Sequence, residues 1–133
     1  MPVSRPIRVA AVAALLATAL AAPATTHAAD RACTLSASIK AANHSPHADK
    51  HFYVTVTTKP STTTVHAKYQ FLFNGNVVST QYVQNDKNFH FRGRFRDGLL
   101  FPPHAIGIAL TVRVVLTSVC GRKTVDWKIK TVK

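Results

Sequence analysis

A row of basic side chains in the second half of the sequence has the residue types and spacing to bind anions. Its members stand at every second position and are His90, Arg92, Arg94 and Arg96. On an extended strand this spacing places all four on one face, about 6.5–7 Å apart. Guanidinium groups grip phosphate, sulfate or carboxylate oxygens with paired hydrogen bonds. By themselves the residues favour a solvated strand face whose arginines discourage edge-to-edge aggregation. The functional alternative is a polyanion-binding face.

A shorter basic row, Lys128 and Lys130, occupies alternate positions near the C-terminus. The chain has 17 Lys and Arg against 5 acids, a net charge of +12. Without the first 28 residues, which hold two Arg and no acid, the balance is 15 against 5, or +10. This excess predicts attraction to polyanions that weakens as salt rises. The candidate partners are an anionic polysaccharide, a cell-wall polymer, extracellular DNA and an acidic protein.

Three histidines in one polar segment form the candidate metal site. His44, His47 and His51 lie close together in the sequence, with Asp49 among them. Imidazoles are common ligands of zinc and copper. The spacing matches no strong metal motif, however, and a solvated loop around Pro46 accounts for it better. We therefore expect no metal or cofactor, and keep a small exported metal-binding protein or enzyme as the alternative function.

Enzymatic chemistry has little support in the composition. The chain has no Glu, and its five Asp fall in predicted termini, turns or one exposed strand position. There is no Gly-x-Ser-x-Gly elbow and no glycine-rich phosphate loop. No pair of carboxylates is placed for glycoside hydrolysis. A Ser–His–Asp triad stays open because triads are defined by geometry, but the sequence favours a protein that is not an enzyme.

The elements that would position these side chains are strands. Apolar and polar residues alternate with a period of two, and turn residues recur about every ten positions. Asn74-Gly75 is typical of a type I′ hairpin, and Trp127 shares the apolar parity of its strand, which predicts a core position. The expected strands cover about 33–40, 52–57, 65–73, 76–83, 89–96, 108–119 and 125–130. Seven or eight short strands with hairpin links predict an all-β, immunoglobulin-like antiparallel β-sandwich.

The N-terminus has the features of a secretory signal peptide. Arg5 and Arg8 precede an apolar run from 9 to 22, and small residues lead to Ala28. We expect cleavage after Ala28. The apolar run has 14 residues, against about 20 for a transmembrane helix, although an uncleaved anchor is the alternative. The sequence thus predicts a signal peptide at 1–28, one domain at 29–133, and a secreted or cell-surface location.

The two cysteines, Cys33 and Cys120, stand near the two ends of the predicted domain. Outside the cytoplasm two thiols usually pair, and a bridge across so long a loop contributes about 4 kcal/mol in the chain-entropy account. In an immunoglobulin-type sandwich the first strand begins at the end where the sixth strand finishes. We therefore expect a Cys33–Cys120 disulfide at one pole, with two buried free thiols as the alternative.

Three stretches carry a resemblance to a known family: 95–107, 110–115 and 121–127. They resemble small secreted bacterial immunoglobulin-like or fibronectin type III-like domains, best over residues 65–130. The resemblance implies adhesion, polysaccharide or matrix contact, or a spacer role, and implies no catalytic residue. The predicted function is a secreted, non-enzymatic binding or structural module with a basic face. A purely structural spacer is a further alternative.

Overall fold

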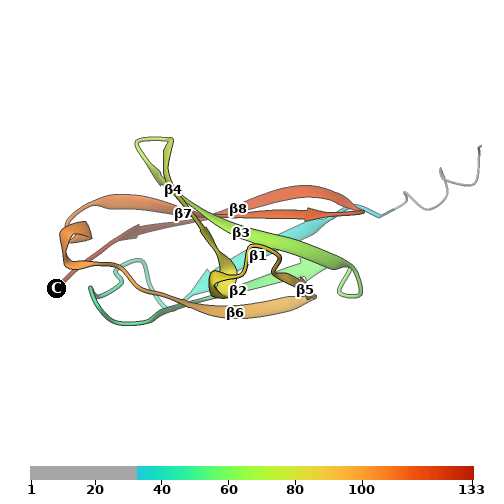
Figure 1. Ribbon diagram of the computed structural model, residues 1–133, viewed down its shortest axis with the longest axis horizontal. Coiled ribbons are helices and arrows are strands. Elements are labelled where there is room, and N and C mark those ends of the chain that lie inside the picture. The colour runs from blue at the N-terminus through green and yellow to red at the C-terminus, as the bar shows by residue number, and fades with distance from the viewer. Residues whose placement is uncertain (1–32) are drawn as a thin grey trace, which may run out of the picture.

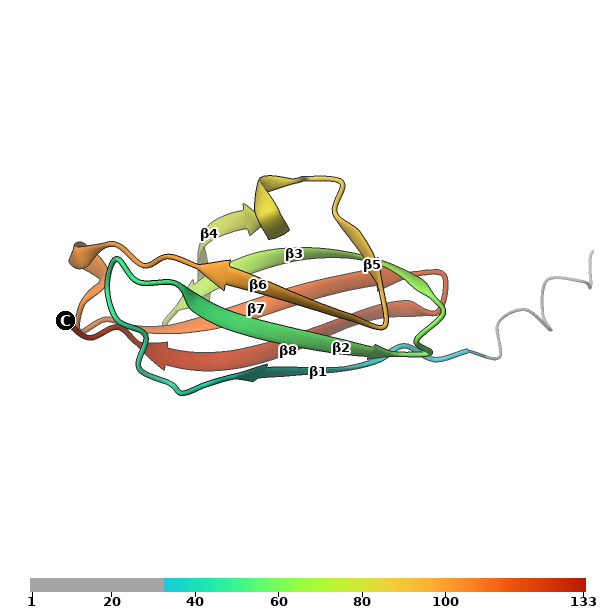
Figure 2. The same cartoon turned by 90° about the horizontal axis from the view of Figure 1, so that it is seen from below.

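Eight β-strands form two antiparallel sheets in the computed structural model, which describes residues 33–133 (Figures 1 and 2). This confirms the predicted all-β sandwich. The predicted signal peptide lies outside the described residues. Among the residues that are described, no helix has the length and apolar character needed to cross a membrane.

The smaller sheet contains three strands in the order β1-β2-β6. Their bounds are β1 (Ser36–Ala41), β2 (Phe52–Lys59) and β6 (Arg94–Leu99). Both pairings are antiparallel. The central strand, β2, alternates buried and more exposed side chains along its whole length, because one face of the sheet covers the core and the other faces solvent.

The larger sheet contains five strands. Four of them follow the order β4-β3-β7-β8, and β5 pairs with the first part of β3. The bounds are β3 (Thr64–Phe73), β4 (Asn76–Tyr82), β5 (His90–Arg92), β7 (Ala109–Ser118) and β8 (Gly121–Lys130). Two short 3-10 turns also occur: η3 (Val83–Asn85) lies between β4 and β5, and η4 (Pro103–Ala105) lies between β6 and β7. Asn74 and Gly75 both have positive φ, as the predicted β3–β4 hairpin requires.

The core lies between the two sheets and is formed mainly by the inward side chains of β2, β3 and β7. Its fully buried members include Val54, Val56, Val65, Ala67, Tyr69, Val112, Val114 and Leu116. These β-branched, aliphatic and aromatic residues suit a pleated surface that is covered on one side. Burial of their apolar area is the main stabilising term of the fold.

Tyr69 brings a polar group into this core. Its hydroxyl donates a hydrogen bond of 3.0 Å to the Asp97 carboxylate of β6, in the opposite sheet. Burial raises the pKa of the Tyr69 phenol well above its usual value, and the nearby Asp97 charge raises it further. The phenol therefore stays protonated and remains a donor, so this bond links the two sheets from inside.

The predicted disulfide is confirmed. Cys33 and Cys120 are bonded, with their Cα atoms 5.1 Å apart. Cys33 precedes β1, and Cys120 lies in the turn between β7 and β8. Next to the bridge, the Leu35 N–H donates to the Cys120 carbonyl over 3.1 Å. The bond therefore joins the two sheets at one end of the sandwich, where β1 lies beside β8 (Figure 2).

Candidate functional site

The predicted row of four basic residues is divided by a glycine. Gly93 has a φ of 73° and separates β5 from β6. Its carbonyl accepts a hydrogen bond of 2.8 Å from the Thr58 N–H. A Cβ on Gly93 would lie 3.2 Å from the Ser61 carbonyl oxygen, so this bend suits glycine alone. The expectation of one continuous strand over 89–96 is therefore wrong.

The division sends the basic side chains to opposite faces of the molecule. β5 pairs with β3 of the larger sheet, and β6 pairs with β2 of the smaller sheet. Phe91 and Phe95 both point into the shared core, where their rings meet edge to face at 4.7 Å. The residues that alternate with them point outward from their own sheets. His90 and Arg92 therefore lie on the larger sheet, and Arg94 and Arg96 lie on the smaller one.

The outer surface of the smaller sheet gathers cations around a shallow hollow, which we call the cationic face. The hollow has a volume of about 470 Å³ and is lined by Ser38, Lys40, Ala41, Ala42, Tyr53, Thr55, Thr57, Arg94 and Arg96. Two rows cross the three strands. Thr57 lies between Ser38 and Arg94, and Thr55 lies between Lys40 and Arg96. Since neighbouring strands are about 4.8 Å apart, Lys40 and Arg96 stand roughly 10 Å apart at the backbone with a hydroxyl between them.

Tyr53 holds one of these cations in place. The Arg96 guanidinium carbon lies 4.1 Å from the centre of the Tyr53 ring, which is a cation–π distance. The His51 ring stacks on the same tyrosine with a centroid distance of 6.0 Å. Gly98 lies opposite Tyr53 on β6, and a Cβ there would come within 3.1 Å of both rings. The arrangement therefore orients Arg96 before any ligand binds.

Carboxylates are absent from the lining of the cationic face. Asp97, although it belongs to β6, points inward to Tyr69. Within residues 33–133 the only salt bridge joins Arg113 and Asp126, at 2.8 Å, on neighbouring strands of the larger sheet. The hydrogen bond to Asp126 raises the pKa of the Arg113 guanidinium above its usual high value. The positive charge of the cationic face is therefore left uncompensated by neighbouring acids, which favours contact with anions.

The other predicted contact residues do not join this face. Lys128 and Lys130 are exposed on β8 and pair with Thr111 and Ala109 of β7, on the larger sheet. Arg92 lies near the other end of that sheet and donates to the Thr64 hydroxyl over 3.0 Å. Of the five predicted Arg and Lys residues, the structure brings together Arg94 and Arg96, and it adds Lys40, which the sequence pattern did not single out.

The three candidate metal ligands contact different partners. His44 stacks on Trp127 at 4.2 Å and donates to the Lys128 carbonyl, while His47 donates to the carbonyl of Lys133. His51 lies against the tyrosine of the cationic face. In the described part of the chain, no three His, Cys, Asp or Glu side chains are grouped to hold a metal ion. His44 and His47 instead tie the segment after β1 to the C-terminal end of the described chain.

Trp127 itself packs at the margin of the core. It is only half-buried, and its indole N–H donates to the Asn43 carbonyl over 2.9 Å. The expected core position is therefore only partly correct, because Trp127 packs against the core and stays partly exposed. The other contacts come from the loop that follows β1.

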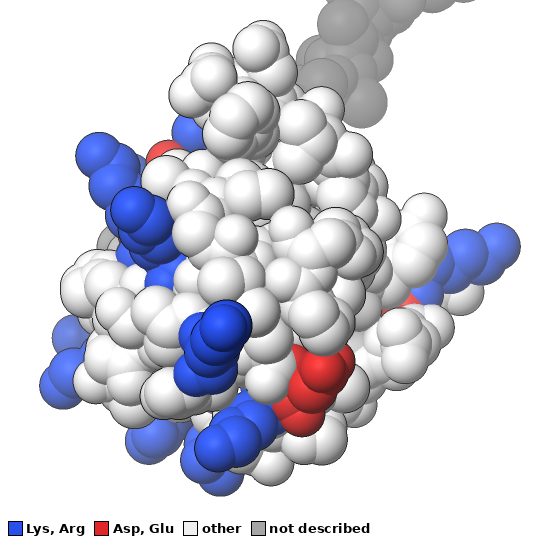
Figure 3. All heavy atoms as spheres, turned by 90° about the vertical axis from the view of Figure 1, so that its left-hand side faces the viewer, with Lys and Arg blue, Asp and Glu red and all other residues white. Residues whose placement is uncertain are grey.

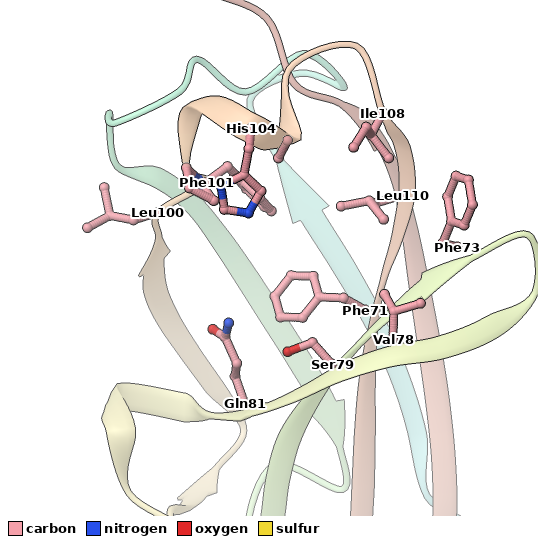
Figure 4. Close-up of a pocket in the computed structure, with 12 residues that line it drawn as sticks. Phe71, Phe73, Val78, Ser79, Gln81, Leu100, Phe101, His104, Ile108 and Leu110 are labelled. Atoms are coloured by element: carbon pink, nitrogen blue, oxygen red, sulfur yellow. The ribbon is translucent and has the colours of Figure 1, made fainter.

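An apolar pocket that the sequence did not predict lies at the end of the sandwich that carries the C-terminus. It has a volume of about 330 Å³, and side chains of the β3–β4 hairpin face those of the segment 100–110 across it (Figure 4). Phe73, Val78 and Leu100 remain 43%, 58% and 56% exposed there. The smaller sheet has too few strands to cover β4, so these side chains stay open to solvent.

Comparisons of the chain with family models, curated proteins and solved structures found no match. The resemblance to immunoglobulin-like and fibronectin type III-like domains therefore stays a prediction from the sequence.

Proposed function

We propose that this chain is a non-enzymatic binding module that contacts anionic polymers through its cationic face. One observation carries the proposal. Lys40, Arg94 and Arg96 line a single hollow that contains no carboxylate, and Tyr53 orients Arg96 in advance. Neutral hydroxyls stand between the cations, so an oxyanion could receive charged and uncharged hydrogen bonds together.

The shape of the site supports a polymer rather than a small ligand. The hollow is shallow and lies on an outer sheet surface, with cations on both edge strands of the sheet. Repeated anionic groups on a passing chain can engage cations about 10 Å apart across the strands. Sulfated or carboxylated polysaccharides and nucleic acids share this chemistry.

The proposed place of action is outside the cell or at its surface. The structure contains a disulfide between Cys33 and Cys120. Disulfides persist in oxidising compartments and are rare in the cytosol. Together with the predicted signal peptide, this supports export.

The double variant Arg94→Gln/Arg96→Gln is expected to elute from a heparin column at lower salt. For duplex DNA, losing two phosphate contacts should lower the magnitude of the slope of log K against log salt by about 1.8. Titration of a fluorescent duplex at several salt concentrations measures this slope. The matched control is Lys128→Gln/Lys130→Gln, which removes the same charge from the larger sheet. Equal losses for both variants would show that only net charge matters and would reject the site.

Tyr53→Leu is expected to weaken heparin binding about two- to fivefold, because an exposed cation–π contact contributes about 0.5–1 kcal/mol. Calorimetric titration at low salt measures the affinity. Tyr53→Phe keeps the ring and should bind as the unmodified protein does. If Phe and Leu weaken binding equally, Tyr53 acts through its hydroxyl and the proposed orientation of Arg96 is wrong.

A further inference from the structure

Strand β4 is an edge strand without the charges or prolines that commonly prevent pairing. Its sequence, NVVSTQY, contains no charged residue and no proline, and all seven residues are exposed. Natural sheets usually protect their edges with charges, prolines or covering segments. A bulge at the Phe71–Leu72 step interrupts its pairing with β3 near the hairpin, but Ser79–Tyr82 continue in regular register.

The other edges of the described sheets carry charge. β8, at the opposite edge of the same sheet, has five charged residues in ten. In the smaller sheet, β1 carries Lys40, and β6 carries Arg94, Arg96 and Asp97. The short strand β5 carries Arg92. Among residues 33–133, β4 is therefore the one sheet edge without a charged side chain.

The backbone of β4 is also available on its outer side. Within residues 33–133 its only strand partner is β3, and no turn, loop or side chain there donates a hydrogen bond to β4 or accepts one from it. In an antiparallel ladder about half of the N–H and C=O groups of an edge strand point away from its partner. These groups can form a further ladder with another strand.

Most of the surroundings of β4 are uncharged, although Lys68 of β3 pairs with Tyr82 and Asp97 shares a hollow with Gln81 and Tyr82. The apolar pocket adjoins its inner side, with Val78 and Leu100 at its rim. Figure 3 shows the end of the molecule that carries the C-terminus. Uncharged residues cover most of the upper part of this view, and Lys and Arg lie mainly to the left and below. Figure 1 places the β3–β4 hairpin in that upper part.

We propose that β4 pairs with β4 of a second copy of this chain, antiparallel across a two-fold axis. The distribution of charge fixes where a second copy can meet the first. Residues 33–133 hold 14 Lys and Arg (17 less three before residue 33) and 4 Asp (5 less one), which gives +10 per copy. Two such copies repel each other wherever charged surfaces meet. The uncharged β4 edge is where they can approach, and a two-fold contact uses the same patch on both copies.

A register centred on Thr80 is the simplest for this pairing. It sets Thr80 opposite the Thr80 of the second copy and Ser79 opposite Gln81, so only uncharged side chains meet. Thr–Thr pairs across antiparallel strands are favourable. The two larger sheets would become one continuous sheet, and the exposed aliphatic side chains of Val77 and Val78 would lose solvent contact.

The pairing leaves the proposed polyanion site untouched. The cationic face belongs to the smaller sheet, whereas β4 belongs to the larger one. A dimer would present two cationic faces and gain avidity for a long polymer. The two proposals can therefore fail independently.

The test measures molar mass by light scattering during size exclusion, from about 1 μM to about 1 mM protein. Near-physiological salt screens long-range repulsion beyond about 8 Å. The unmodified protein should form a dimer, and Thr80→Lys should weaken dimerisation at least tenfold because two lysines would face each other. Thr124→Lys is the matched control on β8, with the same exposed residue type and charge change, and should dimerise normally.

Opposite charges should restore the pair. Thr80→Glu alone should also be mainly monomeric, whereas an equimolar mixture with Thr80→Lys should form a mixed dimer of one copy of each. Far-ultraviolet circular dichroism confirms that each variant is folded. A monomer at every concentration, a dimer unaffected by Thr80→Lys, equal loss in Thr124→Lys, or a mixture that stays monomeric would each overturn the proposal. A monomeric result would leave the β4 edge to a different chain.

Discussion

Replacing Cys33 and Cys120 together by alanine is expected to lower the free energy of unfolding by about 2–5 kcal/mol. The bridge spans 87 positions of sequence and so restricts most of the unfolded domain. It also fastens the start of β1 to the other sheet, beside the hydrogen bond from Leu35 to the Cys120 carbonyl. Equilibrium unfolding in urea measures the loss through the transition midpoint and its slope.

Reduction provides the control for this prediction. A reductant should bring the unmodified protein close to the stability of the double alanine variant and leave that variant unchanged. If both proteins unfold at the same urea concentration without reductant, the bridge does not stabilise the domain. A change in slope would show that the unfolded state has become less restricted.

Phe95→Ala is expected to cost about 3–5 kcal/mol of unfolding free energy, the range for truncating a buried aromatic residue. Phe95 is 7% exposed. Its ring contacts Phe91 at 4.7 Å and Phe89 at 5.3 Å, both edge to face. These rings come from both sides of the Gly93 bend, so the truncation opens a cavity where the chain crosses between sheets. Urea unfolding again gives the value.

Arg94→Ala is the matched control, because it truncates a long side chain one position away on the outward side of the same strand. Its effect should stay within about 0.5 kcal/mol, as for most surface positions. Comparable losses at Phe95 and Arg94 would mean that the inward and outward assignments on β6 are mistaken.

The stretch from 89 to 96 shows what alternation can and cannot predict. It correctly separated inward phenylalanines from outward basic residues, because this parity depends only on the local backbone. It could not show that the chain changes sheets at Gly93, since two facing sheets share one core and the inward pattern continues across the bend. The outward residues were therefore assigned to one surface when they occupy two.

Structural features that depend on very few residues were the ones that the sequence predicted correctly. Asn74-Gly75 predicted the β3–β4 hairpin because few residue types tolerate its backbone angles. The Cys33–Cys120 bond also followed from few premises, since the described residues offer one possible pair. The hairpin required no knowledge of how the sheets stack, and for the disulfide only its place at one pole did.

Contacts between distant segments were beyond the sequence pattern. His44 and His47 are close in the chain, but their hydrogen-bond partners lie 84 and 86 positions away. The strand at β4 was expected, yet its lack of cover depends on the three-to-five division of strands between sheets. The sequence pattern did not indicate Lys40, because Lys40 and Arg96 lie on two different strands that are brought near each other only by pairing with the strand between them, β2.

The position of the disulfide also determines how the domain responds to mechanical tension. A force pulling on the N-terminal side reaches Cys33 and passes through the covalent bond to Cys120. The segment between Cys33 and Cys120 carries none of this force, so the force cannot pull β1 away from β2 and then unfold the following strands one by one. Between the bridge and Lys133 lie 13 residues, whose fully extended length is about 45 Å at roughly 3.5 Å per residue. Ten of them already form the extended strand β8, so little length is left to be drawn out between these two points. Under load from its two ends, the oxidised domain would behave as a short, nearly inextensible link.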